Sequence, residues 1–371
     1  MRFSTREWLL NALTTVASVV FFLSILEGVL RFLPVTNSTD WTVVTEETPI
    51  LSHTPDHAIT YSMGWDFRYA TERWSNNYGF LNDQDYVTQH PLPLIAVVGD
   101  SYVEAMLNSY ENTFYGRLAS AMEQTTRIYS FGVSGAQLSQ YLVWAEFAAK
   151  TFGPDLLVIP IIANDFDESF FKYKRTRGFH YFSQDGSGLL HRVDRVDSTF
   201  RRIAFSSALG RYLFFHLHVG DALRNAKNSL TKLIEGDDTP ARYIGNVVAD
   251  VPKVQEDDGR RATDLFLNAI TNASGLPAAR IVFVLDAIRP SMYDAEELSR
   301  AGSSYWAKMR DHFIAEATRG GFRVVDMQTA FLRDYAERRT VFEYPTDGHW
   351  NDLAHELVAK ELRESGALAI E

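Results

Sequence analysis

The sequence predicts an α/β fold. We expect a flavodoxin-like three-layer α/β/α sandwich with a central parallel five-stranded sheet, preceded by one N-terminal transmembrane helix. From residue 91 onward, short apolar runs alternate with helical periodicity, and such alternation implies parallel strands covered by helices on both faces. Five apolar runs are present, which is the number of strands in a flavodoxin-like sheet. A long uncharged run near the N-terminus predicts the transmembrane helix.

The N-terminal apolar run extends without a charged residue from Trp8 to Leu26, over nineteen residues. A helix of roughly 20 apolar residues spans the hydrocarbon core of a bilayer. Because Arg2 and Arg6 precede the run, the N-terminus is expected to stay cytoplasmic while the rest crosses. A cleaved signal peptide is the alternative, but its apolar region would be shorter, and no convincing small-x-small site follows Phe22.

Composition excludes several classes of function. The chain of 371 residues carries a formal net charge of −11, which argues against nucleic acid as a partner because phosphate binding needs a basic face. It contains no cysteine, so disulfides, thiolate chemistry and cysteine-based zinc sites are excluded. We find no internal repeat and no low-complexity tract.

Three regions follow from the pattern along the chain. Residues 1–34 form the cytoplasmic tip and transmembrane anchor, residues 35–90 a stalk and lead-in, and residues 91–371 the main domain with an irregular insertion at 166–260. The expected strands of the main domain are 94–98, 127–131, 156–162, 280–285 and 322–326. The expected helices are 112–123, 137–150, 260–272, 297–319, 328–336 and 351–365.

The insertion contains two segments with alternative interpretations. The basic aromatic stretch around 172–177 is a solvated loop, a contact for anionic lipid headgroups, or a contact for an anionic glycan. The apolar segment 203–219 is too short and too polar to span a bilayer. It is expected either to pack on the sheet or to form a lid that lines an acyl chain.

Polar groups follow three of the predicted strands and precede the last helix. They are Gly99-Asp100-Ser101, Gly132 to Gly135, Asn164-Asp165 and Asp347-Gly348-His349. In open α/β sheets the carboxyl edge of the strands is where ligands bind, so these groups are expected to converge there.

The order and context of these motifs resemble the SGNH hydrolase superfamily, also called GDSL esterases and lipases. The resemblance covers roughly residues 78–165 and 280–365. It implies the SGNH fold, with Ser101 as nucleophile and with Asp347 and His349 completing the triad. It also implies an oxyanion hole formed by Ser101, Gly135 and Asn164.

Two further features refine the resemblance. Asn77-Tyr78-Gly79-Phe80 is similar to a segment that precedes the first strand in membrane-anchored bacterial members of the superfamily. Asp347 stands two residues before His349, whereas three is the commonest spacing. The Asp-x-His-Trp spacing resembles the branch that includes polysaccharide O-acetyltransferases.

The chemistry of these residue types supports the same roles. A serine hydroxyl is a weak nucleophile until a base takes its proton. His349 would be that base and later the acid for the leaving group, while Asp347 would fix the imidazole tautomer. Backbone N–H groups of Ser101 and Gly135, with the Asn164 amide, could hold the developing oxyanion.

Several other residues compete for these roles. Ser134 is the best rival nucleophile, because residues 132–136 approximate a nucleophile elbow between strand and helix. Asp100 is expected to orient its turn, Glu104 to be a solvated surface residue, and His355 to lie on the outer face of the last helix. His216 and His218 have no carboxylate at ligand spacing, so we expect neither a metal nor any other cofactor.

The sequence therefore predicts a membrane-anchored serine esterase or O-acyltransferase that acts on ester-linked acyl groups, most simply acetyl. It is expected in the bacterial inner membrane as a single-pass protein with a periplasmic catalytic domain. An aromatic cleft of Tyr102, Trp144 and Trp350 would favour an envelope glycan as substrate. The alternative is a non-catalytic SGNH-fold scaffold subunit that binds a membrane protein partner.

Overall fold

The computed structural model describes residues 5–183, 187–188, 190–220 and 251–370. The chain forms two compact units. The first, here called the anchor unit, combines Met1–Thr39, Ile59–Glu72 and Asp197–Pro240. The second, here called the sheet unit, combines Asp40–Ala58, Arg73–Val196 and Ala241–Glu371.

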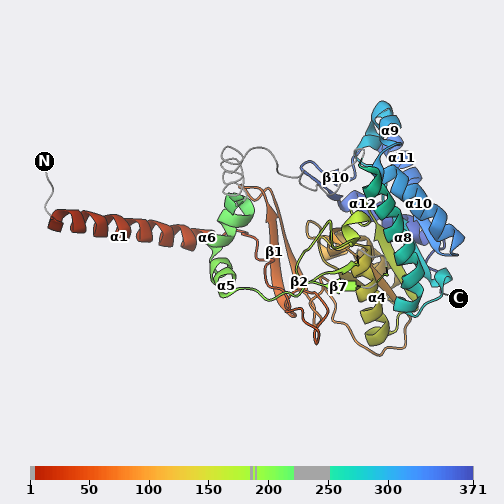
Figure 1. Cartoon of the computed structure of the whole chain (residues 1–371), viewed down its shortest axis with the longest axis horizontal. Helices are drawn as coiled ribbons and strands as arrows, with labels where there is room; N and C mark the ends of the chain where they lie inside the picture. The colour runs from red at the N-terminus through yellow and green to blue at the C-terminus, as the bar shows by residue number, and fades with distance from the viewer. Residues whose placement is uncertain (1–4, 184–186, 189, 221–250, 371) are drawn as a thin grey trace. The chain divides into compact units, whose positions relative to one another are not determined.

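A five-stranded parallel sheet forms the centre of the sheet unit (Figure 1). Its strands lie in the order β4 (Arg127–Gly132), β3 (Leu94–Gly99), β5 (Leu156–Ile161), β8 (Ile281–Leu285) and β9 (Arg323–Asp326). Numbered along the chain, this is the order 2-1-3-4-5 of flavodoxin-like folds. The predicted α/β class, sheet size and strand direction are therefore confirmed.

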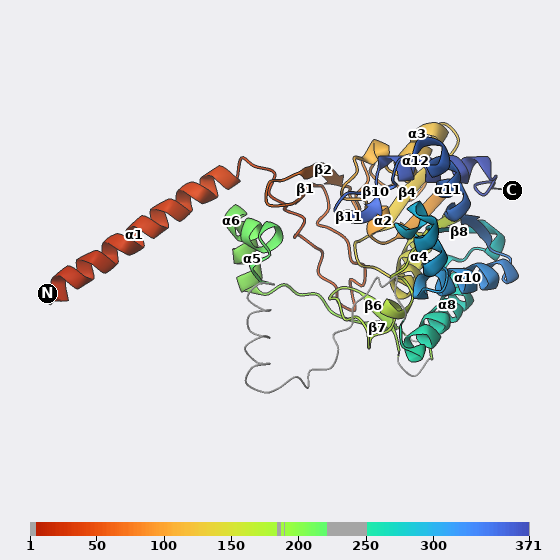
Figure 2. The same cartoon turned by 90° about the horizontal axis from the view of Figure 1, so that it is seen from above.

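Helices cover both faces of the sheet, as Figure 2 shows. One face packs against α4 (Leu138–Phe152), α8 (Lys253–Ser274) and α10 (Tyr305–Arg319). The other packs against α3 (Phe114–Met122), α11 (Met327–Arg338) and α12 (Asp352–Glu364). Strand β3 contributes Leu94, Ala96 and Val98 to the first core and Ile95 and Val97 to the second, because successive side chains of a strand point to opposite faces.

Shorter elements complete the sheet unit. They are α2 (Ser101–Glu104), η1 (Tyr110–Asn112), η2 (Asp167–Ser169), β6 (His180–Phe182), β7 (Leu190–Arg192), η4 (Ala278–Arg280), η5 (Ser291–Tyr293), α9 (Ala295–Ala301), β10 (Glu343–Tyr344) and β11 (Asp347–Trp350). The pairs β6–β7 and β10–β11 are antiparallel hairpins. The hairpin β10–β11 carries Asp347 and His349 just before the N-terminus of α12.

The predicted single helix over 297–319 is wrong. The structure has two helices there, α9 and α10, separated at Gly302-Ser303-Ser304. The Ser304 hydroxyl accepts a hydrogen bond from the Ala307 N–H and so caps the start of α10. The helical spacing of apolar residues continues across Ser304, so the sequence pattern does not reveal the break between the two helices. Part of the predicted insertion, residues 221–250, lies outside the described residues.

The anchor unit contains α1 (Thr5–Leu30), and no residue of its most apolar window is buried in the structure. Among the described residues it is the one helix long and apolar enough to cross a membrane. Arg2 lies outside the described residues. The unit also contains α5 (Thr199–Ser206), α6 (Ala208–Arg211) and η3 (Tyr212–His216). The strands β1 (His57–Met63) and β2 (Tyr69–Ser75) pair with each other, and residues 59–63 and 69–72 of them belong to the anchor unit.

Candidate active site

Ser101 is the first residue of α2, directly after the carboxyl end of β3. Asp100 caps this short helix by accepting a hydrogen bond from the Tyr102 N–H at 2.9 Å. Gly99 is required at the turn because an added Cβ would overlap the Val103 side chain. The predicted structural role of Asp100 is consistent with this cap, and the turn leaves Ser101 half-buried at the sheet edge.

The Ser101 hydroxyl donates a hydrogen bond to Asp100 Oδ2 at 3.2 Å. Burial raises the pKa of Asp100 to about 6, although the Tyr102 N–H and the charge of His349 oppose this shift. Asp165 lies near Asp100, and burial together with the charge of Asp100 raises the pKa of Asp165. Both effects favour the protonated form of Asp165, because two neighbouring buried carboxyl groups rarely ionise together.

His349 and Asp347 form a hydrogen-bonded pair on β11. The His349 Nδ1 atom contacts Asp347 Oδ1, which also accepts the His349 backbone N–H at 2.9 Å. Burial disfavours both charges, but the hydrogen bond and mutual attraction outweigh it. The pKa of Asp347 is therefore lowered and that of His349 raised. The spacing of two residues is therefore compatible with direct contact between the Asp347 carboxylate and the His349 imidazole.

His349 lies close to the turn that carries Ser101. The His349 and Tyr102 ring centroids are 5.1 Å apart, and the Tyr102 hydroxyl donates to the Gly348 carbonyl at 3.0 Å. The negative charge of Asp100 contributes to the raised pKa of His349. Within the described residues, no hydrogen bond joins Ser101 Oγ to the His349 ring, because the hydroxyl faces Asp100.

A buried ion pair after β8 supports the hairpin that carries His349. Arg289 contacts Asp286 Oδ2 at 2.7 Å and Glu343 Oε2 at 3.0 Å. It also donates to the Gly348 carbonyl at 3.2 Å and to the Tyr102 hydroxyl at 3.3 Å. Sequence reasoning missed both members of the pair. The strand-end position of Asp286, like that of Asp100, was the available signal.

Two backbone N–H groups at the site have no partner in the described part of the chain. They belong to Ser101 and Gly135, and the latter adopts φ of +84°, a conformation that favours glycine. Asn164 is buried at the end of β5, and its side chain hydrogen-bonds Glu168. These are the three residues expected to form the oxyanion hole.

Glu104 is not a solvated surface residue, so that prediction is wrong. Its side chain is fully buried because α2 turns back over the end of β4. One carboxylate oxygen accepts from the Ser134 N–H at 2.7 Å and from the Ser134 hydroxyl. The other contacts His53 Nε2 at 2.7 Å. Glu104 thus holds the turn that presents Gly135, and it engages the rival nucleophile Ser134.

The lead-in segment completes this buried network. Trp41 stacks on the His53 ring with centroids 4.0 Å apart. The backbone N–H of His53 donates a hydrogen bond to the Gly79 carbonyl at 2.9 Å, and Gly79 belongs to the Asn77-Tyr78-Gly79-Phe80 motif. The motif therefore holds the backbone of His53, whose ring contacts Glu104.

The insertion contributes a second charged pair beside the site. Lys174 forms an ion pair with Glu168, whose pKa is raised by burial against the opposing charge of Lys174. An added Cβ on Gly135 would lie 3.6 Å from Lys174 Nζ. The Glu168 carboxylate thereby joins the Asn164 side chain to Lys174.

Two further predictions are wrong. His355 is buried rather than on an outer face, and its Nδ1 accepts the Phe114 N–H at 3.2 Å. Burial lowers the pKa of His355 to about 3. Trp144 and Trp350 are fully buried core residues and cannot line an aromatic cleft, so only Tyr102 of that set remains at the site.

His216 is buried in the anchor unit, where its Nδ1 contacts the Gly64 carbonyl at 2.9 Å. Among the described residues, no three His, Cys, Asp or Glu side chains are grouped so that they could share a metal ion.

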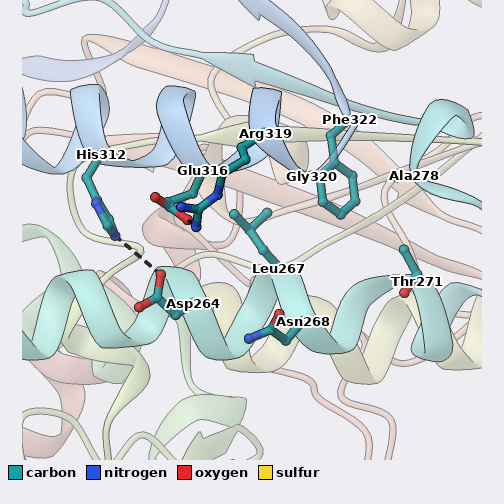
Figure 3. A pocket seen from close by; sticks show the side chains of 10 residues that line it. All are labelled: Asp264, Leu267, Asn268, Thr271, Ala278, His312, Glu316, Arg319, Gly320 and Phe322. Atoms are coloured by element: carbon teal, nitrogen blue, oxygen red, sulfur yellow. Dashed lines mark hydrogen bonds and ion pairs between the residues drawn. The ribbon is translucent and has the colours of Figure 1, made fainter.

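A groove of about 630 Å³ lies elsewhere on the sheet unit (Figure 3). Helices α8 and α10 line it, with His312 Nε2 at 3.4 Å from Asp264 Oδ1. Ala278 and Phe322, which also line it, precede β8 and β9 in the chain. The groove therefore lies toward the amino ends of the strands, opposite to the edge that carries Ser101.

The five-stranded parallel sheet agrees with the fold that the SGNH resemblance implied, and Ser101, Asp347 and His349 lie near one another beside its carboxyl edge. No family model matches the chain. No curated protein matches it either.

Solved structures similar to the chain include three described as hydrolase-type proteins. One is a member of the lipolytic protein G-D-S-L family from Veillonella parvula, at 12% identity, 73% and 96% coverage of the two chains and TM-score 0.35. Another is LAE5, an alpha/beta hydrolase enzyme from the metagenome of Lake Arreo, at 14% identity, 75% and 96% coverage and TM-score 0.38. A third is the acetyl xylan esterase AlAXEase, at 11% identity, 73% and 98% coverage and TM-score 0.39.

Proposed function

We propose that the protein is a membrane-anchored serine esterase or O-acyltransferase of SGNH type. The observation that carries the proposal is the His349–Asp347 pair beside the Ser101 turn. A carboxylate on Nδ1 leaves Nε2 of the imidazole as the atom that exchanges protons with Ser101 and substrate. The partnerless N–H groups of Ser101 and Gly135 supply the oxyanion donors.

The proposed reaction proceeds through an acyl-enzyme. Ser101 Oγ attacks the ester carbonyl carbon while His349 takes its proton. The carbonyl π electrons move to oxygen, and the resulting oxyanion accepts hydrogen bonds from Ser101, Gly135 and Asn164. Collapse expels the alcohol, which receives the proton from His349. For the first step, the Ser101 hydroxyl turns from Asp100 toward His349.

The second half of the reaction decides between hydrolysis and transfer. Water or a sugar hydroxyl gives its proton to His349 and attacks the acyl carbon on Ser101. Collapse breaks the bond to Ser101 Oγ, which takes the proton back from His349, and the free acid or a new ester is released. We propose an acetyl ester of an envelope glycan as substrate, because α1 would hold the sheet unit close to the envelope. The proposed location is the bacterial inner membrane, with the sheet unit in the periplasm.

Single variants test the nucleophile. With nitrophenyl acetate as substrate, Ser101→Ala is expected to lower kcat by at least about 10³-fold, since the residues of a triad act as a unit. Ser134→Ala is the matched control and is expected to keep activity within about tenfold, because its hydroxyl is bound to Glu104. Activity that survives the first change and is lost with the second would overturn the assignment.

A product assay separates hydrolysis from transfer. The full chain is incubated with an acetyl donor and a glycan acceptor, and acetylated glycan and free acetate are both measured. Acetate alone, with no acceptor product, would contradict transfer and leave the esterase.

A non-catalytic scaffold is the second candidate function. It is favoured by one observation, the Ser101 hydroxyl bonded to Asp100 rather than to His349. A fluorophosphonate probe distinguishes the two, because it reacts only with an activated serine. Labelling of folded wild type that disappears in Ser101→Ala supports the enzyme, whereas an unlabelled Ser101 in folded protein supports the scaffold.

A further inference from the structure

The anchor unit carries an exposed apolar surface beside the end of α1. On α5, Phe200 is 80% exposed and Ile203 is 66% exposed, one helical turn apart. Phe214 of η3 is also exposed and packs at a tilted angle against Phe205, at 5.2 Å between ring centroids. Trp65, at the turn between β1 and β2, is 70% exposed. We call these residues with Thr199–His216 the collar.

Hydrogen bonds attach the collar to the last turns of α1. The Glu27 carboxylate accepts from the Ala208 N–H at 3.1 Å and the Leu209 N–H at 2.8 Å. It also accepts from the Ser207 hydroxyl at 2.7 Å. Leu30 and Ala208 share a small buried apolar cluster. The collar is therefore fixed to α1 by both polar and apolar contacts.

The turn that carries Trp65 belongs to the same assembly. The Tyr212 hydroxyl donates to the Trp65 carbonyl at 2.9 Å. The Phe67 ring packs edge-on against His216, with centroids 4.9 Å apart. These contacts place the exposed Trp65 side chain on the same unit as α5 and η3.

The length of the uncharged run sets the depth of the collar. Nineteen residues at 1.5 Å each span about 29 Å, close to the roughly 30 Å hydrocarbon core. Glu27 directly follows this run and thus sits at the edge of the hydrocarbon when α1 spans the bilayer. Segments bonded to Glu27 then lie at the level of the lipid headgroups.

The composition of the collar suits that level. Tryptophan and tyrosine concentrate at membrane interfaces, and interfacial helices combine apolar side chains with arginine. On α5, Arg201 and Arg202 directly follow Phe200. Basic residues near an anionic leaflet are attracted to its surface. An exposed apolar surface of this kind has a ready partner in the bilayer that α1 crosses.

We propose that the collar is an interfacial membrane-binding site, with Phe200, Ile203, Phe214 and Trp65 inserted among the headgroups of a bilayer containing anionic lipid. This inference rests on the proposed anchoring by α1. The collar would hold the base of the anchor unit against the membrane surface rather than leave it on a free stalk.

Single introduced cysteines test the proposal, because the natural chain has none. The full chain is reconstituted in vesicles of phosphatidylcholine and phosphatidylglycerol and labelled with an environment-sensitive fluorophore at Phe200→Cys or Ile203→Cys. Lipids carrying a quencher near the headgroup, or deep in the acyl chain, then report the depth of the label. At both collar positions we expect at least about twofold stronger quenching from the shallow lipid than from the deep one.

Two controls make the outcomes distinguishable. Phe21→Cys, within α1, should be quenched by the deep lipid, and Val341→Cys, exposed on the sheet unit, by neither.

If Phe21 is quenched but both collar positions behave like Val341, the collar proposal is overturned while anchoring stands. If Phe21 itself is not quenched, the anchoring proposal fails. If the collar positions are shielded from both lipid quencher and aqueous iodide, the surface is covered by a second copy of the chain, and the collar proposal is again overturned.

Discussion

At the scale of single residues, the charge state of His349 should set the pH dependence of the reaction. His349 must be neutral to accept the Ser101 proton, and Asp347 and Asp100 hold its pKa above 6.5. The acidic limb of kcat/KM is therefore expected to have its midpoint above pH 6.5, with activity rising as pH increases. Asp347→Asn removes the main stabilisation of the imidazolium, so burial should then shift this midpoint downward while kcat falls by about 10⁴-fold.

The measurement is kcat/KM on a soluble ester between pH 5 and 9, where the model-peptide histidine value of about 6.5 serves as reference. An exposed carboxylate variant, Glu123→Gln, serves as the control and should leave the midpoint unchanged. A midpoint that stays in place in Asp347→Asn would contradict the assigned pair.

Glu104 is expected to act as a positioning residue rather than as a catalytic one. Glu104→Gln keeps the size of the side chain but offers a single acceptor oxygen, so it loses its contact with either Ser134 or His53. One lost buried contact of this kind corresponds to about 1–2 kcal/mol. We expect kcat to fall by about tenfold with KM little changed, because the Gly135 N–H would bind the oxyanion that forms only in the transition state.

Steady-state kinetics together with denaturant unfolding measure this split. The result that would count against positioning is an equal change in kcat and KM, or a loss confined to stability. Ser134→Ala should reproduce part of the effect, since it removes one of the two Ser134 contacts to the same carboxylate.

The sequence located the candidate residues that stand directly after apolar strands, such as Ser101 and Asn164, because parallel strands bring their carboxyl ends to one edge. It failed where burial depended on tertiary packing. Glu104 reads as a polar residue after a turn, and only the return of α2 over β4 buries it. His355 has no sequence signal for the Phe114 N–H that it receives.

At the scale of elements, the lead-in segment should be coupled to the fold through Gly79. This residue adopts φ of +79°, and an added Cβ would overlap the His53 carbonyl oxygen. Gly275 has a similar φ of +67° but open space around its Cβ position. Gly275→Ala should therefore cost about 1–2 kcal/mol for the left-handed backbone alone, and Gly79→Ala clearly more.

Chemical denaturation of the two variants and the wild type gives the comparison. Equal destabilisation would show that the contact between the Asn77-Tyr78-Gly79-Phe80 motif and His53 carries no weight. Because His53 contacts Glu104, Gly79→Ala should also lower kcat, whereas Gly275→Ala, which follows α8, should not.

The elements differ in how well a sequence pattern can define them. The strands β3, β5 and β8 are continuous apolar runs between turn residues, and their predicted bounds agree with the structure within about a residue. The break between α9 and α10 was missed because the apolar period continues across it. Hairpin β10–β11 has only two and four residues in its strands, too short for an alternating pattern to be seen.

At the scale of the whole molecule, the side of the membrane on which the sheet unit lies can be tested separately from its chemistry. The charge pattern around the uncharged run, with Arg2 and Arg6 before it, predicts that the chain after α1 leaves the cytoplasm. A single introduced cysteine reports the side of the membrane, since no natural cysteine competes for the label. Val341 is exposed on the sheet unit and lies outside the proposed site, so Val341→Cys should preserve activity.

In bacterial cells with a permeabilised outer membrane and an intact inner membrane, a membrane-impermeant maleimide should label Val341→Cys fully. A cysteine placed at Thr5, at the other end of α1, should react only after the inner membrane is opened. The reverse pattern would place the sheet unit in the cytoplasm, where an envelope glycan is not the substrate, although the Ser101 chemistry would stand. The topology of the chain and the chemistry of Ser101 are thus tested independently, because the residues labelled in the topology experiment, Thr5 and Val341, take no part in the proposed reaction.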